Sequence, residues 1–348
     1  MKKYISLLQQ LIAAPSLSRQ EVETASILEL FLQAEGSSTR RLRNNIWSKN
    51  KHFDSNKPSI LLNSHHDTVK AAASYTRNPY DASIEDGKLY GLGSNDAGGA
   101  LVTLLATFLH FYDREDLAYN LIFAASAEEE ISGKNGIALL LPELGEIVVG
   151  IVGEPTLMQM AVAEKGLMVV DGIARGKSGH AAREEGENAI HKAIQDIEYI
   201  KNLELEKVSP LLGKTKMTVT QINAGTQHNV VPDECSFVID VRTNECYSNQ
   251  EVFEILQANT RSKLKARSFR LNSSSIPLDH PLVKRGKVLG RSSYGSPTLS
   301  DQALMSFPTL KMGPGDSARS HTADEFIYTK ELEEAFVIYK QLLENLVL

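Results

Sequence analysis

The sequence predicts an α/β fold with a mostly parallel sheet and a smaller inserted domain. Short continuous apolar runs alternate with helical patterns, which is typical of strands buried on both faces; these runs cover residues 59–64, 120–125, 147–152 and 308–312. Between about residues 164 and 272 the predicted order becomes strand, helix, strand, strand, helix, strand, the ferredoxin-like split unit. A length of 348 residues also favours two domains. We therefore expect one domain from residues 1–163 and 273–348, with residues 164–272 inserted into it.

Helical patterns flank the apolar runs. Ile5, Leu8 and Leu11 have helical spacing and predict an amphipathic helix that ends before Pro15. The spacing of Ser18 and Glu21 predicts a capping box at the start of a second helix, which runs through about residue 34 and is closed by a glycine at position 36. A third helix is expected over residues 101–111. The last helix is expected over residues 330–348, with residue 329, a threonine, as its N-cap.

The inserted domain has its own pattern of strands and helices. Strands are predicted at residues 167–174, 217–223 and 234–242, and helices at 188–203 and 250–260. A last strand is predicted at residues 267–271. This order predicts a four-stranded sheet with two helices.

Composition excludes several classes of protein. The chain has 37 Lys and Arg against 43 Asp and Glu, without a basic block, so we expect no nucleic-acid binding. Cys235 and Cys246 are its two cysteines, too few for a disulfide framework. No apolar run approaches the roughly 20 residues that a membrane span needs. We expect a cytoplasmic protein that does not associate with membranes.

A His-His-Asp sequence follows the first apolar run. Along a strand His65 and Asp67 share a face, whereas His66 points to the other. A histidine that binds a metal usually donates its second ring N–H to a carboxylate, so this pair fits a ligand with its supporting acid. A surface turn with two solvated histidines is the alternative.

A glycine-rich segment, residues 91–100, precedes the third predicted helix and contains Asp96. Asp96 is either the N-cap of that helix or a metal ligand. A nucleotide-binding loop is a weaker alternative, because the segment lacks the lysine and serine of a P-loop and the third glycine of a dinucleotide fingerprint.

Other candidates also follow apolar runs. Three adjacent glutamates, residues 128–130, come after the second run, and Glu154 comes after the third. His321 lies beyond the fourth, after a Gly-Pro-Gly-Asp sequence. Adjacent buried carboxylates repel, and a divalent cation relieves that repulsion. Ligands bind beyond the carboxyl ends of parallel strands, so these side chains are expected at one sheet edge. Their nitrogen and oxygen atoms suit Zn²⁺, with Mn²⁺ or Co²⁺ as substitutes.

Taken together, these motifs resemble the dizinc amidohydrolases, a family that includes acetylornithine deacetylase, succinyl-diaminopimelate desuccinylase, aminoacylase and glutamate carboxypeptidase. The resemblance runs from an Ala-Pro-Ser sequence at residues 14–16 to the Ser-His-Thr-Ala-Asp-Glu sequence at 320–325. It implies a mostly parallel dizinc catalytic domain with a ferredoxin-like lid and dimerisation domain. Ser64 stands where the family usually has glycine, and Glu128 where it usually has aspartate. Neither change removes a ligand.

The resemblance also implies a role for each motif residue. His65 and Glu154 would hold one Zn²⁺, Glu130 and His321 the other, and Asp96 would bridge the two, with a cis peptide bond to Ala97. Asp67 would orient His65, and Glu129 would act as general base and then as acid. In the inserted domain, His180 would reach the partner subunit's site and stabilise the oxyanion. Asn229, Arg242 and Lys165 would bind the substrate.

The implied activity is removal of an N-acyl group, acetyl or succinyl, from an amino acid such as ornithine, citrulline or lysine, in arginine or lysine biosynthesis. The substrate would be a small N-acyl amino acid, and the protein a homodimer formed through the inserted domain. Alternatives within the family are a succinyl-diaminopimelate desuccinylase, a di- or tripeptidase and a carboxypeptidase. A metal-dependent binding protein without activity is a further alternative, although such a protein would have no need of Glu129.

Overall fold

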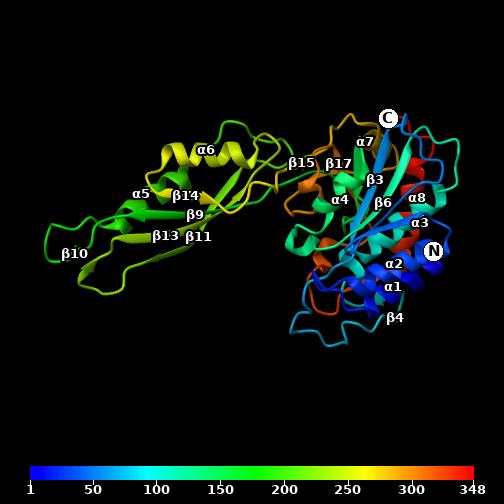
Figure 1. The fold of residues 1–348 in the computed structure, drawn as a ribbon, viewed down its shortest axis with the longest axis horizontal. Coiled ribbons are helices and arrows are strands. Elements are labelled where there is room, and N and C mark those ends of the chain that lie inside the picture. The colour runs from blue at the N-terminus through cyan, green and yellow to red at the C-terminus, as the bar shows by residue number, and fades with distance from the viewer. The chain divides into compact units, whose positions relative to one another are not determined.

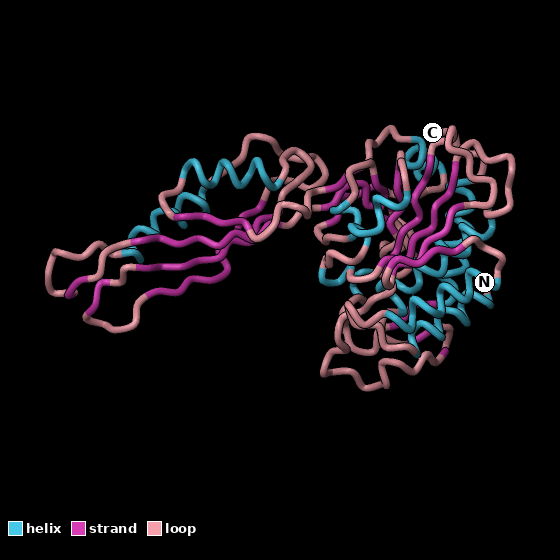
Figure 2. Tube along the Cα trace, in the orientation of Figure 1, coloured by secondary structure: helices cyan, strands magenta, loops and turns pink.

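The computed structural model describes residues 1–348 and divides them into two compact units. The larger unit comprises Met1–Val162, Ser275–Tyr294 and Ser300–Leu348, and the smaller unit comprises Ala163–Ser274 and Gly295–Leu299. Figures 1 and 2 show the ribbon and the Cα trace of both units.

A nine-stranded sheet with the order β1-β2-β6-β3-β7-β17-β8-β15, and with β16 beside β8, is the main sheet of the fold. Its strands are β1 (Thr39–Leu42), β2 (Asn45–Lys49), β3 (Ser59–His65), β6 (Asn120–Ser126), β7 (Val149–Val152), β8 (Met160–Glu164), β15 (Ser274–Ser275), β16 (Ser293–Ser296) and β17 (Thr309–Lys311). The central strands β6, β3, β7 and β17 run parallel, whereas β1, β2 and β8 pair antiparallel to their neighbours. Every residue of β3 and β6 is buried, which explains their continuous apolar runs.

Helices cover both faces of the central strands (Figure 1). They are α1 (Lys2–Ala13), α2 (Val22–Ala34), α3 (Gly99–Phe111), α4 (Ile137–Leu144), α7 (Pro281–Val288) and α8 (Thr329–Leu343). Helix α3 is almost wholly buried and packs against β3, β6 and α8. Helix α4 packs on the opposite face, where Ile137, Leu140 and Leu144 join a cluster with Leu61 and Ile122. A small separate sheet has the order β18-β5-β4, formed by β4 (Ile84–Glu85), β5 (Lys88–Tyr90) and β18 (Phe326–Tyr328).

The smaller unit is a four-stranded antiparallel sheet with two helices. Its elements are β9 (Met168–Arg175), α5 (Ala189–Asn202), β11 (Lys216–Ala224), β13 (Glu234–Arg242), α6 (Asn249–Asn259) and β14 (Lys263–Ala266). The strand order β11-β13-β9-β14 places the first and third strands in the centre, as in the expected ferredoxin-like unit. Both helices contribute to one apolar core with β9, β13 and β14. A short pair, β10 (Gly179–His180) and β12 (Val230–Val231), lies beyond one end of the sheet (Figure 2).

The predicted capping box of the second helix is wrong. Helix α2 begins at Val22 and has no side-chain cap. The Ser18 hydroxyl instead donates to Asp67 Oδ2 at 2.7 Å, and the Glu21 carboxylate accepts the N–H groups of Arg19 at 2.6 Å and Glu128 at 3.2 Å. Contacts with distant loops therefore take both side chains away from the helix end.

The predicted strand over residues 267–271 is also wrong, because the last strand of this unit is β14 (Lys263–Ala266). Only Leu264 in β14 is buried, and lysines on either side of it hide the strand pattern. Residues 267–271 form a loop against the start of α6, where the Leu271 carbonyl accepts from Asn249 Nδ2 at 2.7 Å and the rings of Phe253 and Phe269 lie 5.3 Å apart.

The last helix differs from its prediction at both ends. Tyr328, rather than Thr329, is its N-cap, and the Glu331 carboxylate accepts the Tyr328 N–H at 3.0 Å. Helix α8 ends at Leu343, where the Tyr119 hydroxyl donates to the Leu343 carbonyl at 2.6 Å. None of the helices is both long and apolar enough to cross a membrane.

Phe237 is the largest fully buried side chain in the core of the smaller unit. It is 1% exposed on β13 and lies opposite Gly172 of β9, where its ring fills the space that a side chain at Gly172 would occupy. We predict that Phe237→Ala lowers the free energy of unfolding by about 3–5 kcal/mol, because no neighbour fills the cavity. Denaturant titration followed by circular dichroism measures this change. Val208→Ala, at a position 50% exposed, should change it by under about 0.5 kcal/mol; equal losses in the two variants would contradict the assignment.

Candidate metal centre

Several candidate side chains lie at one edge of the main sheet, where neighbouring strands end. His65 is the last residue of β3, Glu129 and Glu130 form a short turn just after β6, and Glu154 follows β7. These three strands are parallel neighbours, so their carboxyl ends meet. Asp96 comes from a distorted turn, Ser94–Gly98, in front of α3; its peptide bond to Ala97 is cis. His321 comes from the loop that follows β17.

The side chains converge on Asp96. Ligand atoms of His65, Asp96 and Glu130 all lie within 4.8 Å of one another, and so do those of His65, Glu129 and Glu154. Asp96 Oδ1 is 3.4 Å from His65 Nε2, and Asp96 Oδ2 is 3.5 Å from His321 Nε2. The Asp96 carboxylate thus lies between the two imidazoles and presents a different oxygen to each.

Each histidine also has a glutamate of its own. Glu154 Oε1 lies 3.9 Å from His65 Nε2, and Glu130 Oε2 lies 3.1 Å from His321 Nε2. The cluster therefore divides into two histidine–glutamate pairs that share one aspartate. That is the arrangement expected of two cations bridged by a carboxylate.

His65 has the protonation and the burial that a metal ligand requires. Its Nδ1 lies 2.9 Å from the Asp67 carbonyl, which can only accept, so Nδ1 carries a proton and Nε2 is the ring atom left to bind a cation. His65 Nε2 is buried and has no hydrogen-bond partner, although it faces two carboxylates. A buried polar atom without a partner is costly, and a cation at this point would satisfy it. The donor set of imidazole and carboxylate fits Zn²⁺, Mn²⁺ or Co²⁺.

The charges of the cluster also favour a cation. Burial, together with the nearby Glu154 and Asp301, raises the pKa of Glu129 well above its usual value, although His65 opposes this shift. Burial and the neighbouring Asp96 raise the pKa of Glu154 to about 8. The hydrogen bond to Glu130 raises the pKa of His321 to about 9. Buried carboxylates this close together favour added positive charge, which divalent cations supply.

The three adjacent glutamates have different surroundings. Glu128, at φ 55°, folds onto its own loop, where its carboxylate accepts from Asn135 Nδ2 at 2.8 Å and from the Asn135 N–H at 3.3 Å. Glu129 and Glu130 face the cluster, and their N–H groups donate to Asp67 Oδ1 at 3.0 Å and Oδ2 at 3.2 Å. Glu128 therefore stabilises the turn, whereas the carboxylates of Glu129 and Glu130 are available to the cluster.

Asp67 contacts His65 differently from the prediction. The close partner of His65 Nδ1 is the Asp67 carbonyl, whereas Asp67 Oδ1 lies 3.5 Å away. The Asp67 carboxylate mainly accepts the N–H groups of the Glu129–Glu130 turn and the Ser18 hydroxyl. Asp67 therefore connects the end of β3 to the turn after β6.

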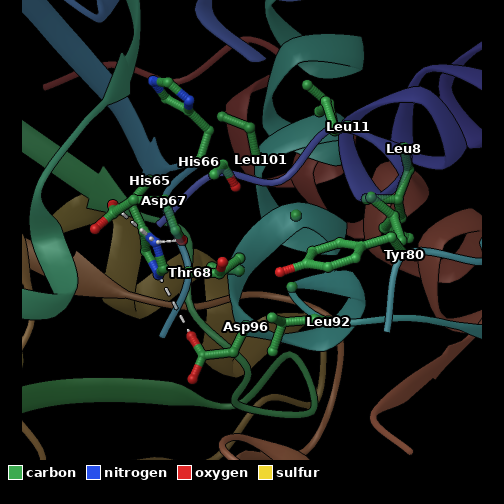
Figure 3. Close-up of a pocket in the computed structure, with 16 residues that line it drawn as sticks. Leu8, Leu11, His65, His66, Asp67, Thr68, Tyr80, Leu92, Asp96 and Leu101 are labelled. Carbon is green, nitrogen blue, oxygen red and sulfur yellow. Dashed lines mark hydrogen bonds and ion pairs between the residues drawn. The ribbon is translucent and has the colours of Figure 1, made fainter. Parts of the chain in front are cut away.

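His66 points away from this cluster (Figure 3). Its Nε2 donates to the Asn44 carbonyl at 2.8 Å, and its Nδ1 lies 2.8 Å from Thr24 Oγ1. Burial lowers the pKa of His66 to about 4, so its ring is neutral at pH 7. His65 and His66 are both buried, which rules out a solvated surface turn.

The alternatives considered for Asp96 do not fit the structure. The N-cap of α3 is Gly98, so Asp96 is not a cap. The N–H groups of Asn95 and Asp96 donate to Glu325 Oε1 at 2.8 and 2.9 Å, and those of Ser94 and Gly98 donate to carbonyls within the loop. The loop therefore has few free N–H groups for a phosphate.

Sequence reasoning did not assign a role to Glu325. The side chain is only 2% exposed, and it supports the segment that carries Asp96. Glu325 lies four residues after His321 in the sequence. Its partners, the N–H groups of Asn95 and Asp96, are more than 200 residues away, and no pattern in the sequence connects them to it.

The remaining candidates lie in the smaller unit. His180 and Asn229 adjoin each other through the β10–β12 pair, where the Ala181 N–H donates to the Asn229 carbonyl at 2.9 Å. Arg242 Nε donates to Asp240 Oδ1 at 2.8 Å. Lys165 Nζ donates to the Lys214 carbonyl at 3.2 Å. The roles of these four residues toward substrate remain predictions.

Known proteins resemble this chain over nearly its whole length. The acetylornithine deacetylase of Proteus mirabilis is 28% identical over 98% of this chain and 96% of its own length. A succinyl-diaminopimelate desuccinylase of Beijerinckia indica is 28% identical over 77% of this chain and 75% of its own length.

Two solved structures share the fold at 18% identity. The aminopeptidase PepT of Bacillus cereus superposes with a TM-score of 0.76 over 99% of this chain and 98% of its own. The YXEP protein of Bacillus subtilis, described as a dinuclear metal binding peptidase from the M20 family, has a TM-score of 0.75 over 98% of this chain and 97% of its own.

The sequence model of Peptidase family M20/M25/M40 matches residues 61–345, which span both units. The fold, the cluster of possible metal ligands and this match agree. The chain therefore belongs to Peptidase family M20/M25/M40 and is a hydrolase of that metallopeptidase family.

Proposed function

We propose that the protein hydrolyses the amide bond of a small N-acyl amino acid, an acetyl or succinyl derivative of ornithine, citrulline or lysine, within arginine or lysine biosynthesis in the cytoplasm. The observation that carries the proposal is a half-buried carboxylate, Glu129, beside two histidine–glutamate pairs that share Asp96. The two curated relatives described above are deacylases of N-acyl amino acids by name, and they support this substrate class.

We assign His65 and Glu154 to one cation, Glu130 and His321 to the other, and Asp96 to both. Zn²⁺ is the preferred ion, with Co²⁺ or Mn²⁺ as substitutes. When bound, such a pair of cations polarises the acyl carbonyl and makes a water molecule a nucleophile near neutral pH.

Glu129 moves the proton in this mechanism. Its carboxylate accepts a proton from the attacking water and later donates it to the nitrogen that leaves as the free amine. Burial and nearby negative charge raise its pKa, and a raised pKa helps a carboxyl group to hold the proton between the two steps. The Asp67 carboxylate fixes the turn that carries Glu129 by accepting its N–H.

Residues of the smaller unit complete the proposed mechanism. His180 donates to the oxygen that becomes negative in the tetrahedral intermediate, a contact worth roughly 3 kcal/mol in such sites. Arg242 and Asn229 bind the carboxylate of the amino acid, and Lys165 makes a further substrate contact. We further propose that the protein is a homodimer formed through this unit, and that His180 acts on the site of the partner subunit.

A peptidase is the second candidate, because the fold superposes closely on that of an aminopeptidase. A peptidase would use the same cations and the same Glu129, but would cleave a peptide with a free amino group. A binding protein without activity is less well supported, because the cluster retains a carboxylate beyond those needed for the two cations.

A substrate panel tests the proposed function directly. The Zn²⁺-loaded protein is assayed with N-acetyl and N-succinyl derivatives of ornithine, citrulline and lysine, N-succinyl-diaminopimelate and unblocked dipeptides and tripeptides. The proposal predicts the highest kcat/KM for one acyl-ornithine, -citrulline or -lysine. Cleavage of the free peptides alone would establish the peptidase, and cleavage of none of the compounds would favour a binding protein.

We predict that Glu129→Gln binds two cations as the wild type does but loses about 10³-fold in kcat, because the amide cannot take the proton. Metal analysis and steady-state kinetics measure the two effects. Glu130→Gln should lose a cation, and Glu128→Gln should keep both the cations and most of the activity. Near wild-type turnover in Glu129→Gln would refute its role as the base.

Mixing two inactive variants tests the trans role of His180. A hybrid dimer of Glu129→Gln and His180→Ala subunits has one site with an intact Glu129 and an intact His180 from the other subunit. After subunit exchange we expect roughly a quarter of the wild-type activity, because random pairing makes about half the dimers hybrid and each hybrid has one working site. Activity that stays at the level of the separate variants would show that His180 does not act in trans.

A further inference from the structure

Two loops meet at the proposed metal centre. Hydrogen bonds of residues other than the proposed ligand side chains connect these loops to each other. One loop, residues 93–97, carries Asp96, and the other, residues 316–325, carries His321. These loops come from opposite ends of the chain, yet Asp96 must keep one oxygen toward His65 and the other toward His321. The relative position of the loops therefore decides whether Asp96 can serve two cations.

Glu325 is the central contact between the loops. Its carboxylate accepts the N–H groups of Asn95 at 2.8 Å and Asp96 at 2.9 Å on a single oxygen, Oε1. The side chain is 2% exposed, so water does not replace these bonds. In addition, the Gly91 N–H donates to the Glu325 carbonyl at 2.9 Å.

The side chain of Asn95, on the Asp96 loop, binds the His321 loop in turn. Its Nδ2 donates to the Asp316 carbonyl at 3.0 Å and to Ser320 Oγ at 3.3 Å, while its Oδ1 accepts the Asp316 N–H at 3.1 Å. Ser320 is the residue before His321, so this contact lies next to a proposed ligand. Asn95 and Glu325 thus connect both ends of the His321 loop to the Asp96 loop.

We propose that Glu325 is a positioning residue that holds Asp96 in the orientation needed to bridge two cations. Glu325 accepts the N–H groups of two consecutive residues, Asn95 and Asp96, and thereby fixes the backbone from which the bridging carboxylate projects. The contact acts through Asp96 and not on the substrate. It therefore governs the affinity of the centre for its second cation more than the folding of the chain. This inference rests on the two-cation centre of the proposed function.

Titration of the metal-free full-length protein with Co²⁺ tests this role without an activity assay. Isothermal titration calorimetry measures affinity and stoichiometry, and the magnetic coupling of the two ions in electron paramagnetic resonance reports the bridge. Glu325→Leu should bind the first Co²⁺ normally, bind the second roughly 100-fold more weakly and lose the coupling. Glu325→Gln keeps one acceptor oxygen but loses the charge, so it should weaken the second site by only about tenfold.

Asp196 provides a matched control in the smaller unit. This carboxylate is 5% exposed and likewise accepts two consecutive N–H groups, from Arg261 at 3.1 Å and Ser262 at 2.7 Å. Asp196→Asn should lower the melting temperature but leave both Co²⁺ affinities unchanged. Equal weakening of the second site in Asp196→Asn and Glu325→Gln would mean that general loss of stability causes the effect, and would overturn the proposal.

The remaining outcomes are also decisive. A folded Glu325→Leu protein that binds two coupled Co²⁺ ions with wild-type affinities would overturn the inference alone. If Glu325→Leu does not fold, the Glu325→Gln variant decides, and an unchanged second affinity in that variant is the contradicting result. A wild-type protein that binds no Co²⁺ would refute the two-cation function and this inference together.

Discussion

Repulsion between buried carboxylates is the constraint around which this end of the sheet is organised. Asp96, Glu129, Glu130 and Glu154 cluster around the buried His65 and the more exposed His321, and the side chains of Asp96, Glu130 and Glu154 are only 13%, 8% and 11% exposed. Burial and the neighbouring acids raise the pKa of Glu154 to about 8, and Glu129 is shifted in the same direction. A cluster of four carboxylates lowers the stability of the folded protein unless positive charge lies between them. Divalent cations supply that charge, and the carboxylates and imidazoles are ligands that such cations prefer. The buried Nε2 of His65 has no hydrogen-bond partner, and a cation bound there would satisfy it as well.

Two further carboxylates lie just outside the cluster and control its geometry through the backbone. Asp67 accepts the N–H groups of the turn that carries Glu129 and Glu130, and Glu325 accepts those of the turn that carries Asp96. Each of these two carboxylates accepts backbone N–H groups, and neither is assigned as a ligand of a cation. The sheet therefore supplies the approximate positions of the ligands, and these contacts supply the orientations that a bridged centre needs.

The features that could be predicted from the sequence are those that depend on local pattern. The buried runs that end at His65 and before Glu129 identify the central parallel strands, because strands buried on both faces are apolar throughout. The convergence of His65, Glu130, Glu154 and His321 was expected for the same reason, since parallel strands end at one edge, whereas the place of Asp96 was implied only by the family resemblance. The Ser18–Glu21 capping box failed because distant loops bind both side chains, and the strand at residues 267–271 failed because alternating lysines obscure β14. Glu325 could not be assigned, since its partners are more than 200 residues away and no spacing connects them.

Anomalous diffraction from crystals of the Zn²⁺-loaded protein tests the central claim most directly. The account predicts two zinc peaks about 3.5–4 Å apart. One should lie between His65 and Glu154, the other between Glu130 and His321, and Asp96 should contact both. A single peak, no peak, or zinc bound elsewhere without Asp96 would contradict the account.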